Sequence, residues 1–300
     1  MNIMKASLLF CCLLIITTIG CGMRIPLNPK DQNILKPGRI FINIPQNSLQ
    51  PAYSNYTVAG AVIGPLPLLI GAIADSSNRT SAKKCVQPVL DQLADYDYRQ
   101  AFKHKLESGP FQFNWLNSSS IHFERGGPLL VNGGHFLEEA IQKRIEESDS
   151  IVILYEIQYL TTINLDGINA HSRVSVYKPG VTYYKSNELR PLYFNNFTCS
   201  IPFQGLPGDN TCQQNSVLLL KNIQLVKDAL ERSQDHLISM LDYDIQRLRG
   251  DKKEPMVQIT EDGPKIRLAK RSGEFVYVRD MEDRLCAFKP IPHKIDGNRP

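Results

Sequence analysis

The strongest hydrophobic pattern in the chain is a run of β-branched and aromatic residues that extends from 151 to 165. Asp166-Gly167 follows this run, and Asp-Gly is a pair that favours a tight turn between two strands. Residues 168–177 then alternate between apolar and polar side chains, which is typical of a return strand with one buried face. Residues 192–201 offer a third strand, so the pattern predicts an antiparallel meander.

Apolar residues at helical spacing lie on both sides of this meander. Residues 75–106 predict two helices or one bent helix, and residues 135–147 predict another. From Leu219 to Leu248 the apolar side chains recur every three or four positions opposite a charged face, and Gly250 stands where a helix cap is expected. This region predicts one amphipathic helix about 50 Å long, which either packs along the sheet or overhangs it and meets a partner.

The last part of the chain carries a second strand pattern. Three short segments alternate apolar and basic residues around turns and predict a three-stranded meander; they are residues 265–269, 275–279 and 284–288. Together with the first meander and the helices, they indicate an α+β fold. We expect an antiparallel sheet packed against helices, including the long amphipathic helix, with a small C-terminal β meander.

The amino-terminal residues have the layout of a secretory signal. Met1–Lys5 carries one positive charge, and the 15 residues from Ala6 to Gly20 are uncharged and mostly apolar, which is shorter than the roughly 18 to 20 residues of a spanning helix. Cys21 follows at once, and Thr18-Ile19-Gly20-Cys21 resembles a lipobox. The pattern predicts cleavage after Gly20 and a lipid on Cys21; the alternatives are a plain signal cut elsewhere or an uncleaved anchor.

A lipid on Cys21 would fix the mature chain to a membrane, because each buried methylene contributes about 0.8 kcal/mol and one residue would carry several acyl chains. Gly22 follows the cysteine, and this residue, in contrast to Asp, favours sorting to the outer membrane of a Gram-negative cell. The sequence therefore predicts a lipid-anchored protein of the cell envelope, located at the outer membrane.

Charge and composition narrow the class of partner. Of the 34 basic side chains, Lys5 belongs to the signal, so 33 remain against 30 acidic side chains and the net charge is +3. A balance this close to zero does not favour nucleic acid as a partner. With a hydrophobic fraction of 42%, the chain can bury one core of good size or two smaller ones.

Four cysteines remain once the signal and the lipid-bearing residue are set aside: Cys85, Cys199, Cys212 and Cys286. An even number in an exported chain indicates disulfides formed in an oxidising compartment, and four cysteines allow three pairings. Cys199 and Cys212 flank a turn-rich segment that a bridge would close at modest entropic cost. We therefore expect a Cys199–Cys212 disulfide.

The boundaries between these patterns suggest five parts of the chain. They are a lipoprotein signal peptide at 1–20, a tether with a short strand at 21–57, an α+β body at 58–250, a small β-rich module at 255–290 and a tail at 291–300. The short strand is expected at 39–44, where apolar residues alternate with polar ones. A chain of this design would place its folded body beyond a polar, proline-containing linker from the lipid.

The body opens with an apolar, glycine-rich segment, Val58–Ala74, that has two interpretations. Gly60 and Gly64 have GxxxG spacing, which lets helices approach closely in a bilayer and favours membrane contact or self-association. Pro65 and Pro67 argue for a buried hairpin or loop, because they would leave backbone groups without partners in hydrocarbon. The sequence leaves both interpretations open.

Catalytic motifs are missing from the sequence. It contains no GxSxG elbow, HExxH pair, Walker loop or dinucleotide fingerprint. The six histidines fall on separate predicted elements: His104, His122, His135, His171, His236 and His293. Two pairs of aspartates stand two positions apart, which puts the members of each pair on different sides of a helix; these are Asp95 with Asp97 and Asp242 with Asp244. The sequence therefore indicates no cofactor, metal site or catalytic residue.

Several of these features occur together in a known group of proteins. The lipobox and the apolar segment are followed by IADSSNRTSAKKCVQPVLDQLADYDYRQAF, by the hairpin ILYEIQYLTTINLDGINAHSRVSVYKP and by the later long helix. In this combination the chain resembles a family of uncharacterised proteobacterial lipoproteins. The resemblance implies a class of protein and a location, and it carries no catalytic signature.

The expected function follows from the anchor and from the lack of catalytic motifs. We expect a lipid-anchored envelope protein that acts as a non-catalytic binding or assembly factor for an envelope protein partner. One alternative is an oligomeric lipoprotein that contacts the membrane through residues 58–74. The other is a periplasmic hydrolase of unrecognised type, which would require His, Asp and Ser side chains to cluster in one cleft.

Overall fold

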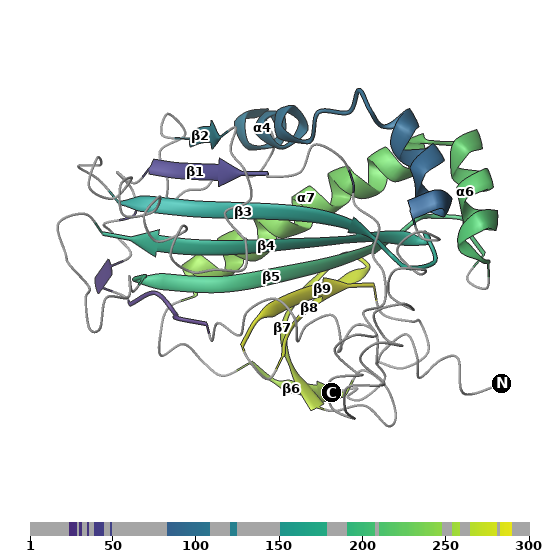
Figure 1. Ribbon diagram of the computed structural model, residues 1–300. Helices are drawn as coiled ribbons and strands as arrows, with labels where there is room; N and C mark the ends of the chain where they lie inside the picture. Colours follow the sequence, from purple (N-terminus) through teal and green to yellow (C-terminus); the bar gives the residue numbers. More distant parts are fainter. Residues whose placement is uncertain are drawn as a thin grey trace, which may run out of the picture.

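The structure of the protein is a computed structural model that describes residues 24–28, 30, 31, 35, 39–44, 49, 83–108, 121–124, 151–178, 191–207, 210–247, 254–258, 265–280 and 283–289. Strands within these ranges form a single sheet in the order β2-β1-β3-β4-β5-β9-β8-β7-β6 (Figure 1). They are β1 (Arg39–Asn43), β2 (Ile121–Glu124), β3 (Val152–Thr161), β4 (Gly167–Tyr177), β5 (Tyr193–Pro202), β6 (Met256–Gln258), β7 (Lys265–Ser272), β8 (Phe275–Arg279) and β9 (Leu285–Phe288).

Two of the described helices, at 98–108 and 224–246, pack on one face of this sheet, and the helix at 212–221 lies at its end. Residues 83–92 are helical, and the other described helices are α4 (Tyr98–Ser108), α6 (Cys212–Lys221) and α7 (Gln224–Gln246). α7 runs behind β3, β4 and β5 as drawn in Figure 1, and it contacts both β4 and β5. This layer of helices on a sheet confirms the predicted α+β class.

The predicted central meander is present as β3, β4 and β5, which pair antiparallel in continuous register. The turn between β3 and β4 differs from the predicted Asp-Gly turn, because residues 162–166 form it. The Thr162 hydroxyl accepts hydrogen bonds from the backbone N–H groups of Asp166 (2.9 Å) and Gly167 (3.0 Å), which closes this longer loop. Gly167 instead begins β4, where a Cβ would approach the Ile201 carbonyl oxygen to 2.6 Å.

The prediction of a purely antiparallel sheet is wrong, because the sheet is mixed. β1 is parallel to both β2 and β3, and β5 is parallel to β9. A parallel pair needs a long connection, and the segment that contains α6, α7 and β6 to β8 provides it between β5 and β9. The predicted C-terminal meander is present as β7, β8 and β9, and through β9 it continues the main sheet.

The prediction of a single helix from 219 to 248 is also wrong, because two helices occupy this region. α6 begins earlier, after Thr211, whose side chain forms a reciprocal capping box with Gln214. It ends at Asn222, where the backbone (φ −147°, ψ 72°) leaves the helical region. The helix that follows, α7, has 23 residues and is about 35 Å long. Gly250, the expected cap, lies outside the described residues.

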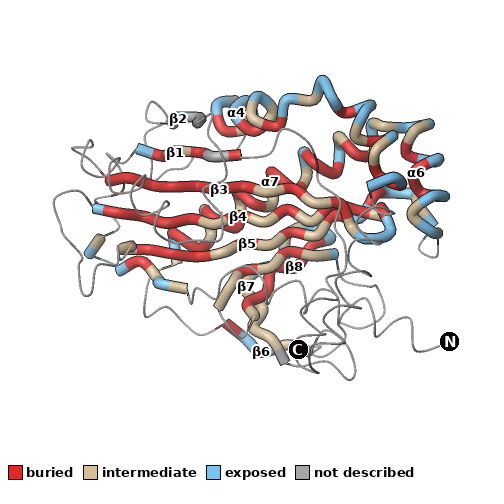
Figure 2. The backbone as a smooth tube through the Cα atoms, viewed as in Figure 1, coloured by how far each residue is buried: buried red, intermediate tan, exposed pale blue. Residues whose placement is uncertain are grey.

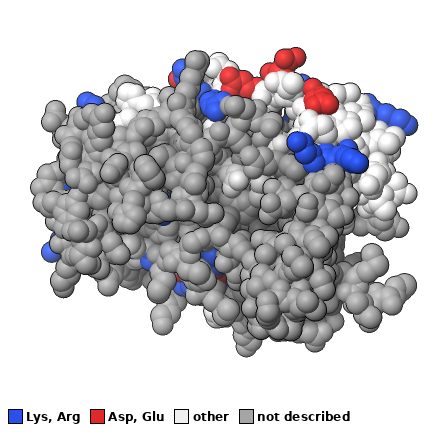
Figure 3. Space-filling view, viewed as in Figure 1, with Lys and Arg blue, Asp and Glu red and all other residues white. Residues whose placement is uncertain are grey.

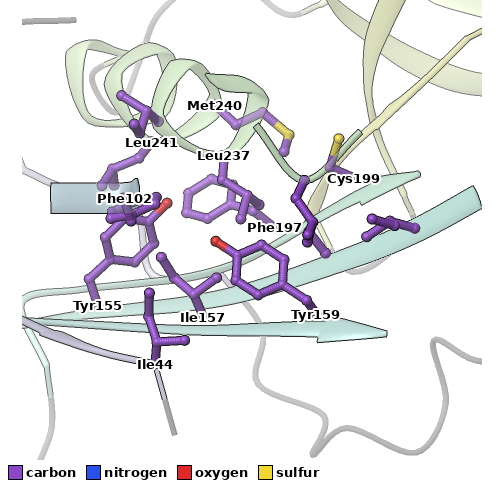
Figure 4. Packing of buried hydrophobic residues seen from close by; sticks show 14 of the residues in the cluster. Ile44, Phe102, Tyr155, Ile157, Tyr159, Phe197, Cys199, Leu237, Met240 and Leu241 are labelled. Atoms are coloured by element: carbon purple, nitrogen blue, oxygen red, sulfur yellow. The ribbon is translucent and has the colours of Figure 1, made fainter. Parts of the chain in front are cut away.

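Aromatic and aliphatic side chains fill the space between the helices and the sheet. Figure 2 shows β3 almost continuously buried, whereas β4 and β5 alternate between buried and intermediate residues. In Figure 4, Leu237 of α7 points toward the rings on the sheet. Tyr155 of β3 meets Phe102 of α4 edge to face, with 5.8 Å between ring centroids, and Tyr159 stacks on Tyr98 at 5.7 Å. These aromatic contacts stabilise the packing of α4 on the central strands.

The disulfide joins Cys85 to Cys212, with a Cα–Cα distance of 6.2 Å, so the predicted Cys199–Cys212 pairing is wrong. Cys199 is a fully buried thiol at an inward position of β5, and it lies near Met240 of α7 (Figure 4). Cys212 is the first residue of α6 and meets the helix at 83–92, which is distant in sequence. The expected pairing rested on closeness in sequence, whereas the two cysteines that pair are far apart along the chain.

Replacing Cys212 with Ser should lower the free energy of unfolding by about 4 kcal/mol, because the bridge spans a sequence separation of 127 residues and restricts the unfolded chain. Chemical denaturation with and without a reductant measures this loss. Cys286→Ser leaves the bridge in place and should keep the sensitivity to reductant. Equal stability of the oxidised and reduced wild type would contradict the assigned pairing.

Candidate functional site

A buried group of charged and polar side chains lies where the end of α7 meets β5 and β8. Asp244 on α7 is inaccessible to solvent, and its carboxylate accepts hydrogen bonds from the Tyr193 hydroxyl (2.6 Å) and the Asn195 amide (2.8 Å) of β5. Arg279 of β8 forms a close ion pair with the same carboxylate, and Arg24 does so at 3.1 Å. We call these residues the Asp244 cluster; they are Asp244, Tyr193, Asn195, Arg279 and Arg24.

Arg279 extends the Asp244 cluster to a second carboxylate. Its side chain is 1% exposed, and its Nε donates to Glu254 Oε1 at 3.0 Å. Its Nη1 donates to the backbone oxygen of Asp283 at 3.2 Å. Glu254 also accepts a hydrogen bond from Tyr243 (3.2 Å) and lies 3.4 Å from Arg247. The buried charges of this region therefore each have a partner of opposite sign.

The surrounding charges decide the protonation state of Asp244. Burial by itself would raise the pKa of this carboxyl, but the guanidinium groups of Arg279 and Arg24 outweigh burial and lower the pKa below its usual value. For Arg279, burial alone would lower the pKa, and the neighbouring Asp244 and Glu254 raise it overall. Asp244 is therefore ionised at neutral pH, which makes it unsuited to donating a proton.

Arg24 brings the amino-terminal part of the described chain into this cluster. It also contacts Asp283 at 3.0 Å, and its side chain is 10% exposed. The next residue, Ile25, exchanges two backbone hydrogen bonds with Phe194 of β5 (2.8 and 3.0 Å), and Leu27 is fully buried. This stretch was expected within a tether, but its side chains and backbone are packed on the body.

A second polar group lies on the face of the sheet opposite to α7. Glu156 of β3 stands directly across from Arg173 of β4, and His171, two residues along β4, contacts Thr198 of β5 with 3.2 Å between Nδ1 and Oγ1. Burial raises the pKa of Glu156 to about 7, although Arg173 lowers it. Burial lowers the pKa of His171 to about 4, so its ring is neutral at pH 7.

A neutral histidine beside a hydroxyl is one part of an activated nucleophile, and His171 with Thr198 has that contact. Such a site also needs a group that orients the histidine. Within the described part of the chain, the buried Nε2 atom of His171 has no hydrogen-bond partner, and neither does one carboxylate oxygen of Glu156. The described residues therefore form a polar face with unsatisfied atoms, without the third member of a hydrolytic triad.

Some residues singled out in the sequence lie outside the described ranges: Cys21, Gly60, Gly64, His135 and His293. The roles predicted for the cysteine and the two glycines stay predictions. The described histidines are on separate elements, as predicted; His104 is on α4, His122 on β2, His171 on β4 and His236 on α7. Within the described ranges, no group of three or more His, Cys, Asp or Glu side chains could hold a metal ion.

The sequence patterns missed the Asp244 cluster, although they contain a signal for it. Asp242 and Asp244 lie on different sides of α7, as predicted, but Asp244 takes the buried side. It stands seven residues after Leu237, within the apolar stripe of the helix. Arg279 likewise ends a strand whose residues are all buried. A charged residue in an apolar stripe indicates a buried partner.

The described charged side chains along one edge of the protein are mixed in sign. Figure 3 shows acidic and basic groups next to each other along the upper edge, where α4 and the helix at 83–92 lie. Lys103 and Glu107 on α4 form one such pair at 3.8 Å. A mixed edge of this kind differs from the basic stripe that contacts nucleic-acid phosphates. None of the described helices is both long and apolar enough to cross a bilayer.

Comparisons with known proteins give one partial similarity. No family model and no solved structure matches the chain. A curated protein named Putative diflavin flavoprotein A 6, from Nostoc sp. (strain PCC 7120), is 27% identical over 132 residues. The match covers 43% of this chain and 23% of that protein, so the chain spans about a quarter of its length. A similarity of this extent does not assign the chain to a family.

Asp244→Asn should lower the free energy of unfolding by about 3 kcal/mol at neutral pH, because Arg279 and Arg24 each lose one of their carboxylate partners at a site closed to water. Asp242→Asn, on the partly exposed side of the same helix, is the matched control and should change stability by less than about 0.5 kcal/mol. Urea denaturation measures both changes. Equal losses in the two variants would contradict the role of the buried carboxylate.

The effect of Asp244→Asn should also depend on pH. The folded state lowers the pKa of Asp244, so this residue stabilises the protein above the unfolded pKa of about 4, and the contribution is lost as the pH falls further. The gap in stability between wild type and variant should therefore shrink below about pH 4. A gap that stays constant down to acidic pH would count against the ion pairs.

The wild type should become less stable as pH rises, because Glu156 ionises, and Glu156→Gln should not show this decrease in stability. The folded pKa of about 7 lies above the unfolded value, so ionisation destabilises the native state by roughly 3 kcal/mol between about pH 4.5 and pH 7. Denaturation curves across this range measure the difference. Glu231→Gln, on the exposed side of α7, is the control, and its stability should change with pH as that of the wild type does. If the stability of the wild type does not change with pH in this range, the pKa of Glu156 is not raised.

Proposed function

We propose that this protein is a lipid-anchored protein of the bacterial cell envelope that acts as a non-catalytic binding or assembly factor. Cys21 carries the lipid, and the membrane that holds it is the outer membrane. The folded α+β body docks a protein partner. The proposal joins the signal pattern of the sequence to the chemistry of the described residues.

The Cys85–Cys212 disulfide is the observation that carries this proposal. Disulfides persist in oxidising compartments and are rare in the reducing cytosol. The bridge therefore supports export, which is also what a signal with a cysteine directly after Gly20 requires. A membrane anchor on the exported chain would keep its body at the envelope surface rather than releasing it.

The contacts of the buried polar groups favour a binding role over catalysis. Asp244 is ionised and paired with two arginines, and those arginines are also paired with Glu254 and Asp283. Among the described residues, none orients His171 at Nε2 in its contact with Thr198. Neither group provides a positioned acid or base of the kind that general acid–base catalysis uses.

The similarity to a diflavin flavoprotein does not lead us to propose flavin binding. One general kind of flavin site lies at the strand ends of a parallel, doubly wound sheet with helices on both faces. The described sheet has an antiparallel meander, β3 to β5, at its centre, and the described helix α7 packs on one face of it. The described residues therefore lack the frame on which that site is built.

Intact mass and membrane fractionation of the wild type beside Cys21→Ser test the proposal. We expect the wild type to carry a lipid-sized mass increment and to stay with membranes, and both properties to vanish in Cys21→Ser. Cys286→Ser, which removes a thiol from the folded body, is the control and should behave as the wild type does. A wild type that is in solution and carries no lipid would make a secreted binding protein or enzyme the better proposal.

A further inference from the structure

We propose that the docked amino-terminal stretch holds the folded body directly against the bilayer in one orientation. The end of the sheet that contains the Asp244 cluster, which we call the proximal end, faces the lipid headgroups. The end that carries α6, the distal end, points away from the membrane. This inference rests on the proposed lipid anchor at Cys21, and its partner is the headgroup layer of the membrane that holds that anchor.

Covalent geometry limits the distance between the lipid and the body. Gly22 and Met23 are the residues that separate Cys21 from Arg24, so the three residue steps span at most about 11 Å. Arg24 is itself held in the body by its ion pair with Asp244. The first fixed point of the body therefore lies within about 11 Å of the lipid-bearing residue.

Contacts beyond Arg24 keep this stretch docked. The backbone of Ile25 pairs with Phe194 through two hydrogen bonds, and Leu27 is inaccessible to solvent. Withdrawal of Arg24 would leave the buried Asp244 with one of its two cations, which is costly because a buried charge needs compensation. The stretch is thus part of the folded body, and the body cannot move away from the membrane on a long linker.

The register of the sheet places this docked stretch at one end of the molecule. Phe194 is the second residue of β5. The opposite end of the meander carries the turn at 162–166, where the Asn215 amide of α6 donates to the backbone oxygen of Asn164 at 3.0 Å. The strands between these points are about 33 Å long. In Figure 1 the purple amino-terminal segment and α6 accordingly lie at opposite ends of the central strands.

The described arginines around the Asp244 cluster are paired, so they offer little free positive charge to headgroups. The pairs include Arg267 with Asp283, Arg284 with Asp280 and Arg247 with Glu254. Attraction to anionic headgroups weakens when salt screens it. An orientation that is set by a short covalent connection should persist at high ionic strength.

Energy transfer to labelled lipids tests the orientation in the lipidated, full-length protein. A fluorescent amino acid replaces either Lys178, an exposed residue after β4 at the proximal end, or Asn164 in the exposed distal turn. The protein is reconstituted in vesicles of phosphatidylethanolamine and phosphatidylglycerol that carry an acceptor on the headgroups. We expect transfer from position 178 to be at least about threefold higher, because β4 separates the two positions by roughly 35 Å.

Three variants separate the docked stretch from the stability of the fold. A flexible insertion of Gly and Ser residues between Met23 and Arg24 leaves the Asp244 cluster intact and lengthens the connection, so the two positions should give similar transfer. Arg24→Ala removes the ion pair but leaves the backbone bonds of Ile25 with Phe194, so it lengthens the connection by one residue and should reduce the difference less than the insertion does. Arg271→Ala, at an exposed position of β7, is the matched arginine control and should keep the threefold difference.

The possible outcomes distinguish this inference from the proposed function. Equal transfer from both positions in a lipidated, membrane-bound wild type would overturn the orientation and leave the anchor standing. A difference that persists in the insertion variant would overturn it as well, because the short connection would then not set the orientation. A wild type without lipid that stays in solution would overturn the proposed function together with this inference.

Discussion

A carboxylate that is closed off from water has to be neutralised by its surroundings, and the described part of the protein is organised around this requirement at Asp244. One cation comes from β8, a second comes from the amino-terminal stretch, and two neutral donors come from β5. Because an uncompensated buried charge costs several kcal/mol, these four contributions have to be present together. The single carboxylate thereby sets how α7, β5, β8 and Arg24 are placed relative to one another.

Strand pairing that is local in sequence could be predicted, and pairing that is distant could not. The run of β-branched and aromatic residues at 151–165 and the alternation at 168–177 indicated β3 and β4, and the C-terminal alternation indicated β7 to β9. The parallel pairs β1 with β3 and β5 with β9 could not be predicted, because the apolar pattern of a strand does not depend on which strand it pairs with. The Cys85–Cys212 bridge could not be predicted either, because the sequence around a cysteine does not show which distant cysteine it contacts.

Expectations based on local composition were also wrong about the contacts of individual polar residues. The stretch around Arg24 is polar and contains prolines, which is typical of a linker, yet its ion pairs and its backbone contacts with Phe194 come from residues far along the chain. The break at Asn222 interrupts an apolar stripe that continues on both sides of it. Asp244 could have been suspected from its place in that stripe, but its partners could not, because each of them lies on another element.

The order in which the chain is made gives the Asp244 cluster a consequence for biosynthesis. Synthesis proceeds from the amino terminus, so the carboxylate emerges before Arg279, and β5 emerges before its parallel neighbour β9. Before β8 is synthesised, docking of α7 on the sheet would bury Asp244 without Arg279, one of its two cations. Early docking of α7 is therefore disfavoured. A polypeptide that stopped short of β8 would therefore keep the apolar side of α7 accessible to chaperones and proteases, so the cluster makes the finished fold depend on a complete carboxyl end.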